Sequence, residues 1–176
     1  MTFSATTLAG LFGKLLVSTV FALTFSSFAD IVVTATVTRV IDGDTFVMAG
    51  VNAAATLRIP SRDGFTVRIV GVDAPERDQP AGREITRALS RALVGTNLIL
   101  SLAEAADGKV AYDKYGRTLA KRLCVDGSTS DLREMLLLQG MAWSTGDDKK
   151  LDVLHAMARN RGVGLWRQTN PVPPWK

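Results

Sequence analysis

Residues 31–51 read IVVTATVTRVIDGDTFVMAGV, and their pattern predicts how the folded chain begins. Residues 31–41 are mostly β-branched, which favours an extended strand. The tripeptide Asp42-Gly43-Asp44 then predicts a tight turn, because Asp and Gly are ordinary turn formers. Residues 45–51 continue as a second strand. The chain is therefore predicted to open with two strands joined by a turn.

Three further strands and three helices are predicted downstream. Residues 65–72 alternate well enough for a strand, and residues 97–102 and 118–124 predict two more. Residues 52–64, which contain Pro60, are turn-like or form a loosely paired extension of the hairpin. The first helix is predicted at residues 82–93. The second begins at Asp131, with Glu134 as its capping-box partner, and ends at Gly140. The third begins at Asp147 or Asp148 and ends near Gly162.

Five short strands with one helix between the third and fourth, followed by two helices, indicate an α+β fold: a five-stranded OB-type β-barrel with three α-helices. A chain of 176 residues is sized for one domain, which we assign to residues 30–168. The tail 169–176 is rich in proline and cannot form regular structure. OB folds bind nucleic acids and sugars alike, so this fold class does not establish a function.

Residues 1–29 contain one ionisable side chain, Lys14, which precedes an apolar stretch. Small residues at Ser27 and Ala29 fit a signal-peptidase site, with Asp30 as the first residue of the mature chain. We therefore expect a cleaved signal peptide and a secreted or periplasmic protein. An uncleaved N-terminal anchor and a buried helix of the domain are the alternatives.

The composition limits the chemistry that the chain can perform. A single cysteine, Cys124, excludes an intramolecular disulfide, and with the single histidine, His155, it also excludes a Cys/His zinc cluster. Any metal must therefore be held mainly by oxygen. We interpret Cys124 as an apolar strand residue, His155 as a helix-face residue, and the three tryptophans as packing or tail residues. The net charge of +4 permits binding to a polyanion without demonstrating it.

Three short charged stretches stand out at predicted turns and strand ends: IDGDT at 41–45, RIVGVDAPE at 68–76 and DKYGR at 113–117. The DGD tripeptide alone is by default only a turn. Arginines combined with carboxylates suit phosphodiester cleavage, because a hard divalent cation on carboxylate and carbonyl oxygens neutralises the phosphate. Guanidinium groups donate paired hydrogen bonds to the phosphate oxygens, and one further carboxylate can orient or deprotonate the attacking water.

These three motifs, in this order, resemble the staphylococcal nuclease (thermonuclease) family, and the resemblance extends from Ile31 to Trp166. It implies an OB-type barrel with helices and hydrolysis of DNA and RNA with calcium. It also implies cleavage of the bond to the 5′ oxygen, which leaves 3′-phosphate ends. Some family members are plasmid-borne and carry a signal sequence, so a role in DNA transfer or plasmid maintenance is consistent with the resemblance.

The resemblance also assigns metal-binding roles. Asp44 and Asp73 resemble the calcium carboxylates, with the backbone carbonyl of Thr45 as a third ligand. Asp42 resembles an acid that does not bind the metal itself but holds one of its waters.

Catalytic and substrate roles are implied in the same way. Arg68 and Arg117 resemble the pair that grips the scissile phosphate and stabilises its transition state. Glu76 resembles the residue that acts as general base or orders the attacking water. Lys114 and Tyr115 match residues that contact the terminal phosphate and sugar of a bound nucleotide.

The chain departs from the type member of the family around the substrate groove. The hairpin between Thr45 and Arg68 is longer, the loop after Glu76 is shorter, and Gly146 falls near the place of a base-stacking tyrosine. These departures leave the preference for DNA or RNA, and for chain ends or interior bonds, open.

Arginines at 83, 87 and 91 recur along one face of the first predicted helix. A solvated face is the default interpretation, and attraction of a phosphate backbone is the functional alternative.

The competing function is a non-catalytic module that binds nucleic acid without cutting it. Such modules typically lose site residues, whereas the six acids and arginines of the predicted site all remain here: Asp42, Asp44, Arg68, Asp73, Glu76 and Arg117. A sugar-binding barrel would not explain the two arginines. We therefore expect an enzyme that acts on DNA and RNA as a monomer, without a stable protein partner and without a transmembrane segment in the mature chain.

Overall fold

The computed structural model describes residues 31–50 and 64–176. The predicted signal peptide at 1–29, and residues 52–63 of the predicted hairpin extension, lie outside the described residues. The elements in chain order are β1 (Ile31–Val40), β2 (Thr45–Ala49), β3 (Phe65–Ile69), β4 (Val72–Asp73), α1 (Gly82–Leu93), β5 (Asn97–Leu102), β6 (Thr118–Val125), α2 (Leu132–Leu138), β7 (Trp143–Ser144), α3 (Lys149–Arg161) and the 3-10 helix η2 (Gly164–Arg167).

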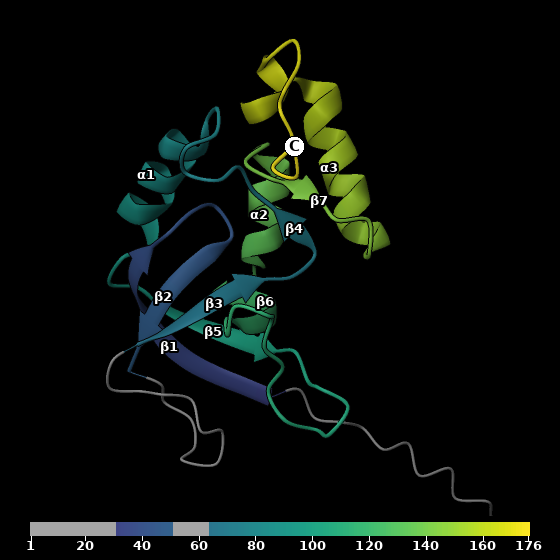
Figure 1. The fold of residues 1–176 in the computed structure, drawn as a ribbon. Helices are drawn as coiled ribbons and strands as arrows, with labels where there is room; N and C mark the ends of the chain where they lie inside the picture. Colours follow the sequence, from purple (N-terminus) through teal and green to yellow (C-terminus); the bar gives the residue numbers. More distant parts are fainter. Residues whose placement is uncertain (1–30, 51–63) are drawn as a thin grey trace, which may run out of the picture.

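Five strands form a barrel, as the sequence predicts, and the structure shows that it is closed in the order β1-β2-β3-β6-β5 (Figure 1). All neighbours pair antiparallel except β3 and β6, which run parallel. Every second residue of a strand points inward, so the barrel is filled by apolar side chains of 1% exposure or less, among them Val33, Phe46, Val67, Leu100 and Leu123. The predicted fold class is confirmed.

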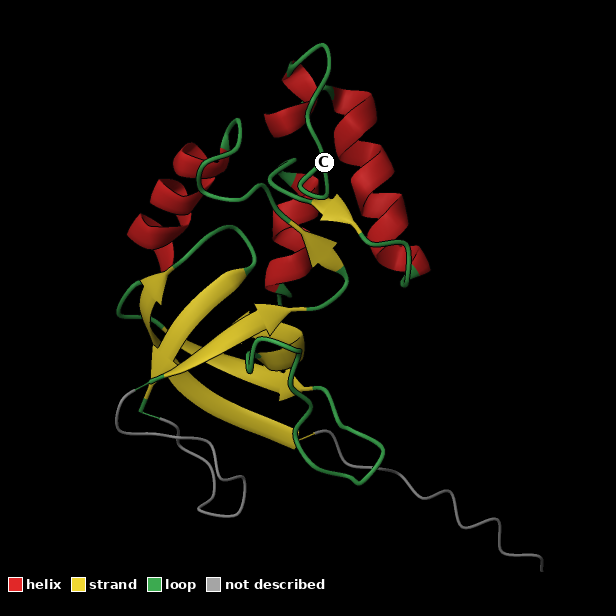
Figure 2. Cartoon of the chain, viewed as in Figure 1, coloured by secondary structure: helices red, strands yellow, loops and turns green. Residues whose placement is uncertain are grey.

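The three predicted helices are present and lie above the barrel in Figure 2, where helices are red and strands yellow. Helix α1 packs against β1, α2 packs against β6, and α3 packs against α2. No helix among the described residues is long and apolar enough to cross a membrane. Residues 168–176 contain no helix or strand, in agreement with their proline content.

Two boundary predictions need correction. The third strand was predicted to reach Val72, but β3 ends at Ile69, because Gly71 takes a left-handed conformation with φ of 87°. Val72 and Asp73 instead form β4, which pairs with β7 in a small separate sheet. The predicted capping box of α2 is half formed: Asp131 accepts a hydrogen bond from the N–H of Arg133, whereas Glu134 pairs with Lys150 of α3. These corrections leave the barrel unchanged.

Candidate active site

The turn between β1 and β2 holds two buried carboxylates. Asp42 and Asp44 are only 4% and 2% exposed. The N–H of Asp44 donates to Oδ1 of Asp42 at 3.1 Å, and the Thr45 hydroxyl donates to Oδ1 of Asp44 at 2.9 Å. Burial raises the pKa of Asp42, although hydrogen bonds from Thr45 and the positive charge of Arg68 oppose it. Such buried acids need cationic partners to stay ionised.

The turn after β4 lies directly against this DGD turn. The N–H of Ala74 donates to Oδ2 of Asp44 at 2.6 Å. A Cβ on Gly43 would overlap the Cβ of Ala74, so only glycine permits this close approach. Two turns that are far apart in the sequence are thereby joined at Asp44, next to Asp73.

Arg68 on β3 bridges the carboxylates of the two turns. One of its terminal nitrogens forms an ion pair with Asp44, and the other donates to Oδ1 of Asp73 at 2.7 Å. The register Thr45↔Arg68 between β2 and β3 fixes this placement. One guanidinium therefore contacts both acids, and its positive charge compensates their negative charge.

The DKYGR loop brings the second arginine to the same turn. Asp113 accepts hydrogen bonds from the N–H groups of Tyr115 and Arg117, and from Nε of Arg117 at 2.6 Å. These bonds hold the pKa of Asp113 below its usual value despite its partial burial. Nη1 of Arg117 lies 3.5 Å from the Thr45 hydroxyl. Arg117 is therefore held rigidly beside the two turns that carry the acids.

The Glu76 side chain reaches the surface but is partly desolvated, and it completes the charged cluster. Burial and the negative charges of Asp42 and Asp73 raise the pKa of Glu76, against the opposing charges of Arg68 and Arg117. These interactions place Glu76 within electrostatic reach of the other site residues. A carboxylate whose pKa is shifted toward neutrality is suited to accept a proton.

The backbone around Glu76 is fixed on both sides. Its N–H donates to Oε1 of Gln79 at 2.9 Å, and Nε2 of Gln79 donates to the carbonyl of Pro174 in the C-terminal tail at 3.1 Å. The first residue of α1, Gly82, packs so closely that a Cβ there would overlap the Glu76 carbonyl oxygen. Glu76 is thereby tied to α1 and to the C-terminal tail.

The carbonyl of Thr45, predicted as a third metal ligand, faces its own turn. It accepts hydrogen bonds from the N–H groups of Ile41 at 2.9 Å and Asp42 at 3.4 Å. This carbonyl therefore takes part in closing its own turn, and its role as a metal ligand stays a prediction.

Lys114 and Tyr115 lie next to Arg117 on the surface. Tyr115 is 71% exposed, and Nζ of Lys114 and Cζ of Arg117 lie 5.0 Å and 5.3 Å from the centre of its ring. These cation–π distances place both predicted substrate-contact residues at the edge of the charged cluster.

The chemistry of the donors fits a hard divalent cation. Asp44 and Asp73 offer carboxylate oxygens, the ligands that Ca²⁺ and Mg²⁺ prefer. In the described ranges 31–50 and 64–176, no group of three or more Asp, Glu, His or Cys side chains is arranged to hold a metal. Backbone carbonyls and water would therefore have to supply the remaining ligands.

Two residues of the site were missed by sequence reasoning. Asp113 orients Arg117, and Gln79 links Glu76 to the tail. For Asp113, the sequence signal was its position four residues before Arg117 in the DKYGR motif. Nothing in the sequence pattern indicates the bond between Gln79 and Pro174, because the two residues are distant in the chain.

The other candidate residues lie outside this cluster. Cys124 is buried, and Trp143 contacts the rings of Trp166 and Trp175 edge-on at 5.3 Å and 6.2 Å. His155 on α3 lies 4.9 Å from Trp166, ring centre to ring centre. Cys124 therefore lies on a strand and His155 on a helix, and the tryptophans make packing contacts, in agreement with the sequence analysis.

Comparison with known proteins agrees with this geometry. The family model described as "Staphylococcal nuclease homologue" matches residues 66–168, which include Arg68, Asp73, Glu76 and Arg117. An "Uncharacterized endonuclease" of Escherichia coli O157:H7 is 31% identical over 142 residues, covering 79% of this chain and 80% of that protein.

Two further relatives, one from a plant and one from Escherichia coli, are also similar to this chain. "Staphylococcal-like nuclease CAN1" of Arabidopsis thaliana is 31% identical over 116 residues, which cover 64% of this chain but 32% of the plant protein. "Protein ParB" of Escherichia coli is 27% identical over 151 residues, covering 80% of this chain and 76% of that protein. The chain folds into a five-stranded barrel, carries acids on two adjoining turns with arginines beside them, and matches the family model. It therefore belongs to the staphylococcal nuclease family and is a hydrolase of the nuclease class.

Proposed function

We propose that this nuclease hydrolyses phosphodiester bonds of DNA, and of RNA, by calcium-assisted attack of water, and that it leaves 3′-phosphate ends. The observation that carries the proposal is the bridge of Arg68 between Asp44 and Asp73, with Arg117 held beside Thr45. Two guanidinium groups and a cation-binding pair of acids thus converge in one place. The 3′-phosphate product rests on the family resemblance.

Each residue has a role that follows from its surroundings. The guanidinium groups of Arg68 and Arg117 donate to the phosphate oxygens and stabilise the negative charge that builds up as water attacks. Glu76 accepts a proton from that water or orients it. Asp42, which accepts the N–H of Asp44, holds the turn in shape. These assignments need no further residue from outside the cluster.

Calcium, held by Asp44 and Asp73, would supply charge neutralisation at the phosphate. Both residues offer hard oxygen donors, and the contact of both with Arg68 supports a shared cation site. Magnesium prefers similar oxygen donors but demands a stricter octahedral arrangement. The choice of calcium over magnesium therefore rests on the family resemblance, and the digest described below compares the two ions.

The test is a digest of circular DNA, linear DNA and RNA with calcium, magnesium or excess chelator. We expect degradation with calcium that stops on chelation. Degradation of the circular DNA would support cleavage inside the strand, as the name "Uncharacterized endonuclease" of the Escherichia coli relative suggests. Equal degradation in excess chelator would contradict the calcium role, and tight binding without cleavage would favour a non-catalytic module.

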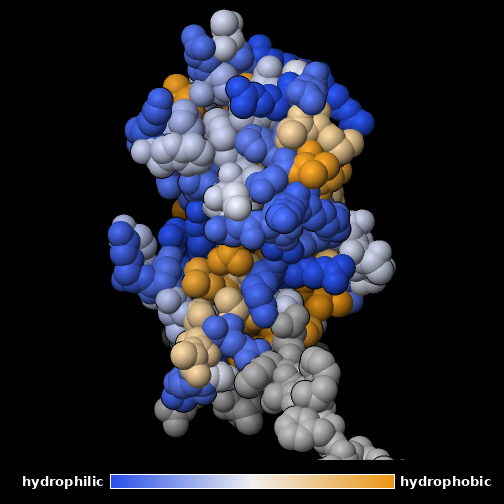
Figure 3. All heavy atoms as spheres, turned by 90° about the vertical axis from the view of Figure 1, so that its right-hand side faces the viewer, coloured by the Kyte–Doolittle hydropathy of each residue, from blue (hydrophilic) through white to orange (hydrophobic). Residues whose placement is uncertain are grey.

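We also propose that the protein is exported to the periplasm or beyond and acts as a monomer. The signal-peptide pattern at 1–29 supports export. Large exposed apolar side chains are spread over β1, α2, α3 and the tail, as at Val32, Met135, Val153 and Trp175, and the face in Figure 3 is mainly hydrophilic. Scattered apolar residues are normal for a monomer. Cell fractionation and light scattering test the two statements.

A further inference from the structure

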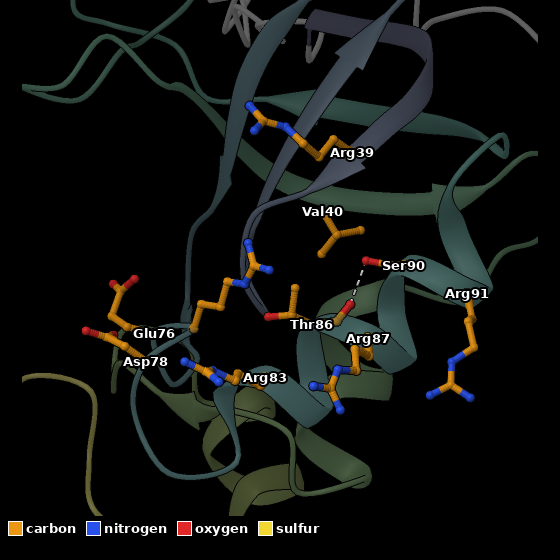
Figure 4. Close-up of a pocket in the computed structure, with 10 residues that line it drawn as sticks. Arg39, Val40, Glu76, Asp78, Arg83, Thr86, Arg87, Ser90 and Arg91 are labelled. Carbon is orange, nitrogen blue, oxygen red and sulfur yellow. Dashed lines mark hydrogen bonds between the residues drawn. The ribbon is translucent and has the colours of Figure 1, made fainter.

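A groove of about 800 Å³ opens between α1 and the end of β1, and it begins at Glu76 (Figure 4). Five arginines line it, against two acids, Glu76 and Asp78. The arginines are Arg39, Arg77, Arg83, Arg87 and Arg91. This groove is therefore strongly positive and is continuous with the catalytic cluster through Glu76.

The arginines of the groove are free for a ligand. All five are exposed, and among the described residues none of them forms an ion pair. By contrast, Arg68, Arg117 and Arg133 each pair with an aspartate. Five unpaired guanidinium groups that share one concave surface repel one another, and an anionic ligand would relieve this repulsion.

The backbone arranges the arginines on both walls. On α1, Arg83, Arg87 and Arg91 lie four residues apart, so they share one face, over about 12 Å at 1.5 Å per residue. On β1, Val33, Ala35 and Val37 point into the barrel, and strict alternation would send Arg39 inward as well. An irregularity between Val37 and Arg39 shifts the phase, so Arg39 is exposed and Val40 is buried.

The floor of the groove is nearly neutral. The Thr86 hydroxyl donates to the carbonyl of Gly82 at 2.8 Å, and the Ser90 hydroxyl donates to the carbonyl of Thr86 at 2.7 Å. Val40 contributes an apolar surface between them. Positively charged walls above an uncharged floor suit a regular polyanion such as a phosphate backbone. The groove offers few groups that could recognise individual bases.

We propose that this groove binds the phosphate backbone of the substrate strand beyond the scissile bond. The assignment of the bound strand as substrate rests on the proposed nuclease function. A span of about 12 Å along α1 corresponds to about three nucleotides at 3.4 Å per nucleotide of one strand. The contacts are independent of sequence and raise affinity for long nucleic acids over short ones.

The test compares two triple variants that lose the same charge. The groove variant is Arg83→Gln, Arg87→Gln and Arg91→Gln. The control is Lys149→Gln, Arg161→Gln and Arg167→Gln, at exposed positions on α3 and η2. Binding of a fluorescein-labelled single-stranded DNA of about 20 nucleotides, longer than an OB fold covers, is measured by anisotropy in chelator over a range of salt concentrations.

We expect the slope of log affinity against log salt to become shallower by about 2 in the groove variant, at about 0.7 per lost phosphate contact. The control should keep the slope of the unmodified protein. Equal slopes in all three proteins, or an equal loss in both variants, would overturn the groove assignment.

A separate measurement of turnover with calcium keeps the two proposals apart. The groove variant should show a raised KM for long DNA, an unchanged kcat, and unchanged hydrolysis of a dinucleotide, which is too short to reach along α1. A raised KM for the dinucleotide as well would overturn the groove assignment. If the unmodified protein cleaves nothing, the nuclease proposal fails, while the salt slope still decides whether the groove binds nucleic acid.

Discussion

Glu76 is the side chain whose protonation state should control the rate. Its pKa is raised by burial and by the charges of Asp42 and Asp73. The base form exists only above that pKa, so kcat/KM should fall as the pH drops through it. Glu76→Gln should slow turnover by about 10² to 10⁴ at neutral pH and abolish this acidic limb.

The measurement is a pH–rate profile of both proteins at saturating calcium. A Glu76→Gln variant that keeps near-normal turnover would remove the proton-transfer role while leaving the metal assignment untouched. A variant that is slow but retains the limb would indicate that another group titrates.

Arg68 is expected to stabilise the protein when calcium is absent. Its guanidinium neutralises Asp44 and Asp73, of which Asp44 is almost fully buried. Arg68→Gln in chelator leaves these acids unpaired, which should lower the free energy of unfolding by about 3 kcal/mol. Calcium should recover part of this loss, because it takes over the neutralisation. Denaturant unfolding with calcium and with chelator measures both values.

Arg133→Gln is the matched control, because Arg133 pairs at similar burial with Asp131, which is not one of the two acids bridged by Arg68. Calcium should not recover its loss of stability. If calcium recovers both variants equally, or neither, Asp44 and Asp73 do not share a calcium ion.

The charged residues of the site could be recognised from sequence because each lies in a short motif at a turn. In the structure, Arg68, Asp73 and Arg117 lie beside the DGD turn, while their roles stay predictions. The direction of the Thr45 carbonyl could not be predicted, because it depends on hydrogen bonds from Ile41 and Asp42 that close the turn. Residue types can be deduced from a motif, but the peptide orientations within it follow from the folded backbone.

The loop between β5 and β6 should control the orientation of Arg117. Asp113 accepts the backbone N–H and the Nε of Arg117. Asp113→Asn removes a charge-assisted hydrogen bond worth about 1.5–3 kcal/mol, so kcat should fall by about 10- to 100-fold. Steady-state kinetics on DNA measures the change.

Asp107→Asn is the control in the same loop, where Asp107 pairs with exposed Lys109 and touches no site residue. It should retain full activity. Equal loss in both variants would indicate that general loosening of the loop, and not the orientation of Arg117, lowers the rate.

The longer elements were predictable and the shortest ones were not. Helix α1 was predicted at its observed bounds, because Ile85, Leu89 and Leu93 recur at helical spacing and are buried. The strands β4 and β7 have two residues each, which is too short for any alternation to register. Their pairing nevertheless matters, because it carries Asp73 toward Arg68.

The count and order of the strands predict a five-stranded barrel, but they do not predict which strands pair to close it. The parallel pairing of β3 with β6 joins residues about fifty positions apart, Val67 with Thr118, and local patterns do not encode such contacts. The same closure brings Arg117, which precedes β6, beside the DGD turn. The site is therefore a product of the whole barrel.

The stability of the whole molecule should fall in mild acid because of His155. Burial, with the charge of Arg159, lowers the pKa of His155 despite the opposing charge of Asp152, and its Nε2 has no hydrogen-bond partner within residues 31–50 and 64–176. As the pH falls below about 6.5, the unfolded chain binds this proton before the folded one, so the free energy of unfolding decreases until the folded pKa is passed.

His155→Gln, which does not titrate, should show a flatter dependence of the unfolding free energy on pH in this range. Denaturant unfolding at a series of pH values compares the two proteins. Parallel curves for both would show that His155 is protonated equally in the folded and unfolded chains.

The most direct test of the whole account is calorimetric titration of calcium into the unmodified protein, Asp73→Asn and Asp107→Asn. The two aspartates lie on different surface segments, and only Asp73 belongs to the pair bridged by Arg68. We expect one calcium site that is lost in Asp73→Asn and kept in Asp107→Asn. Calcium binding that is unchanged in Asp73→Asn would contradict it.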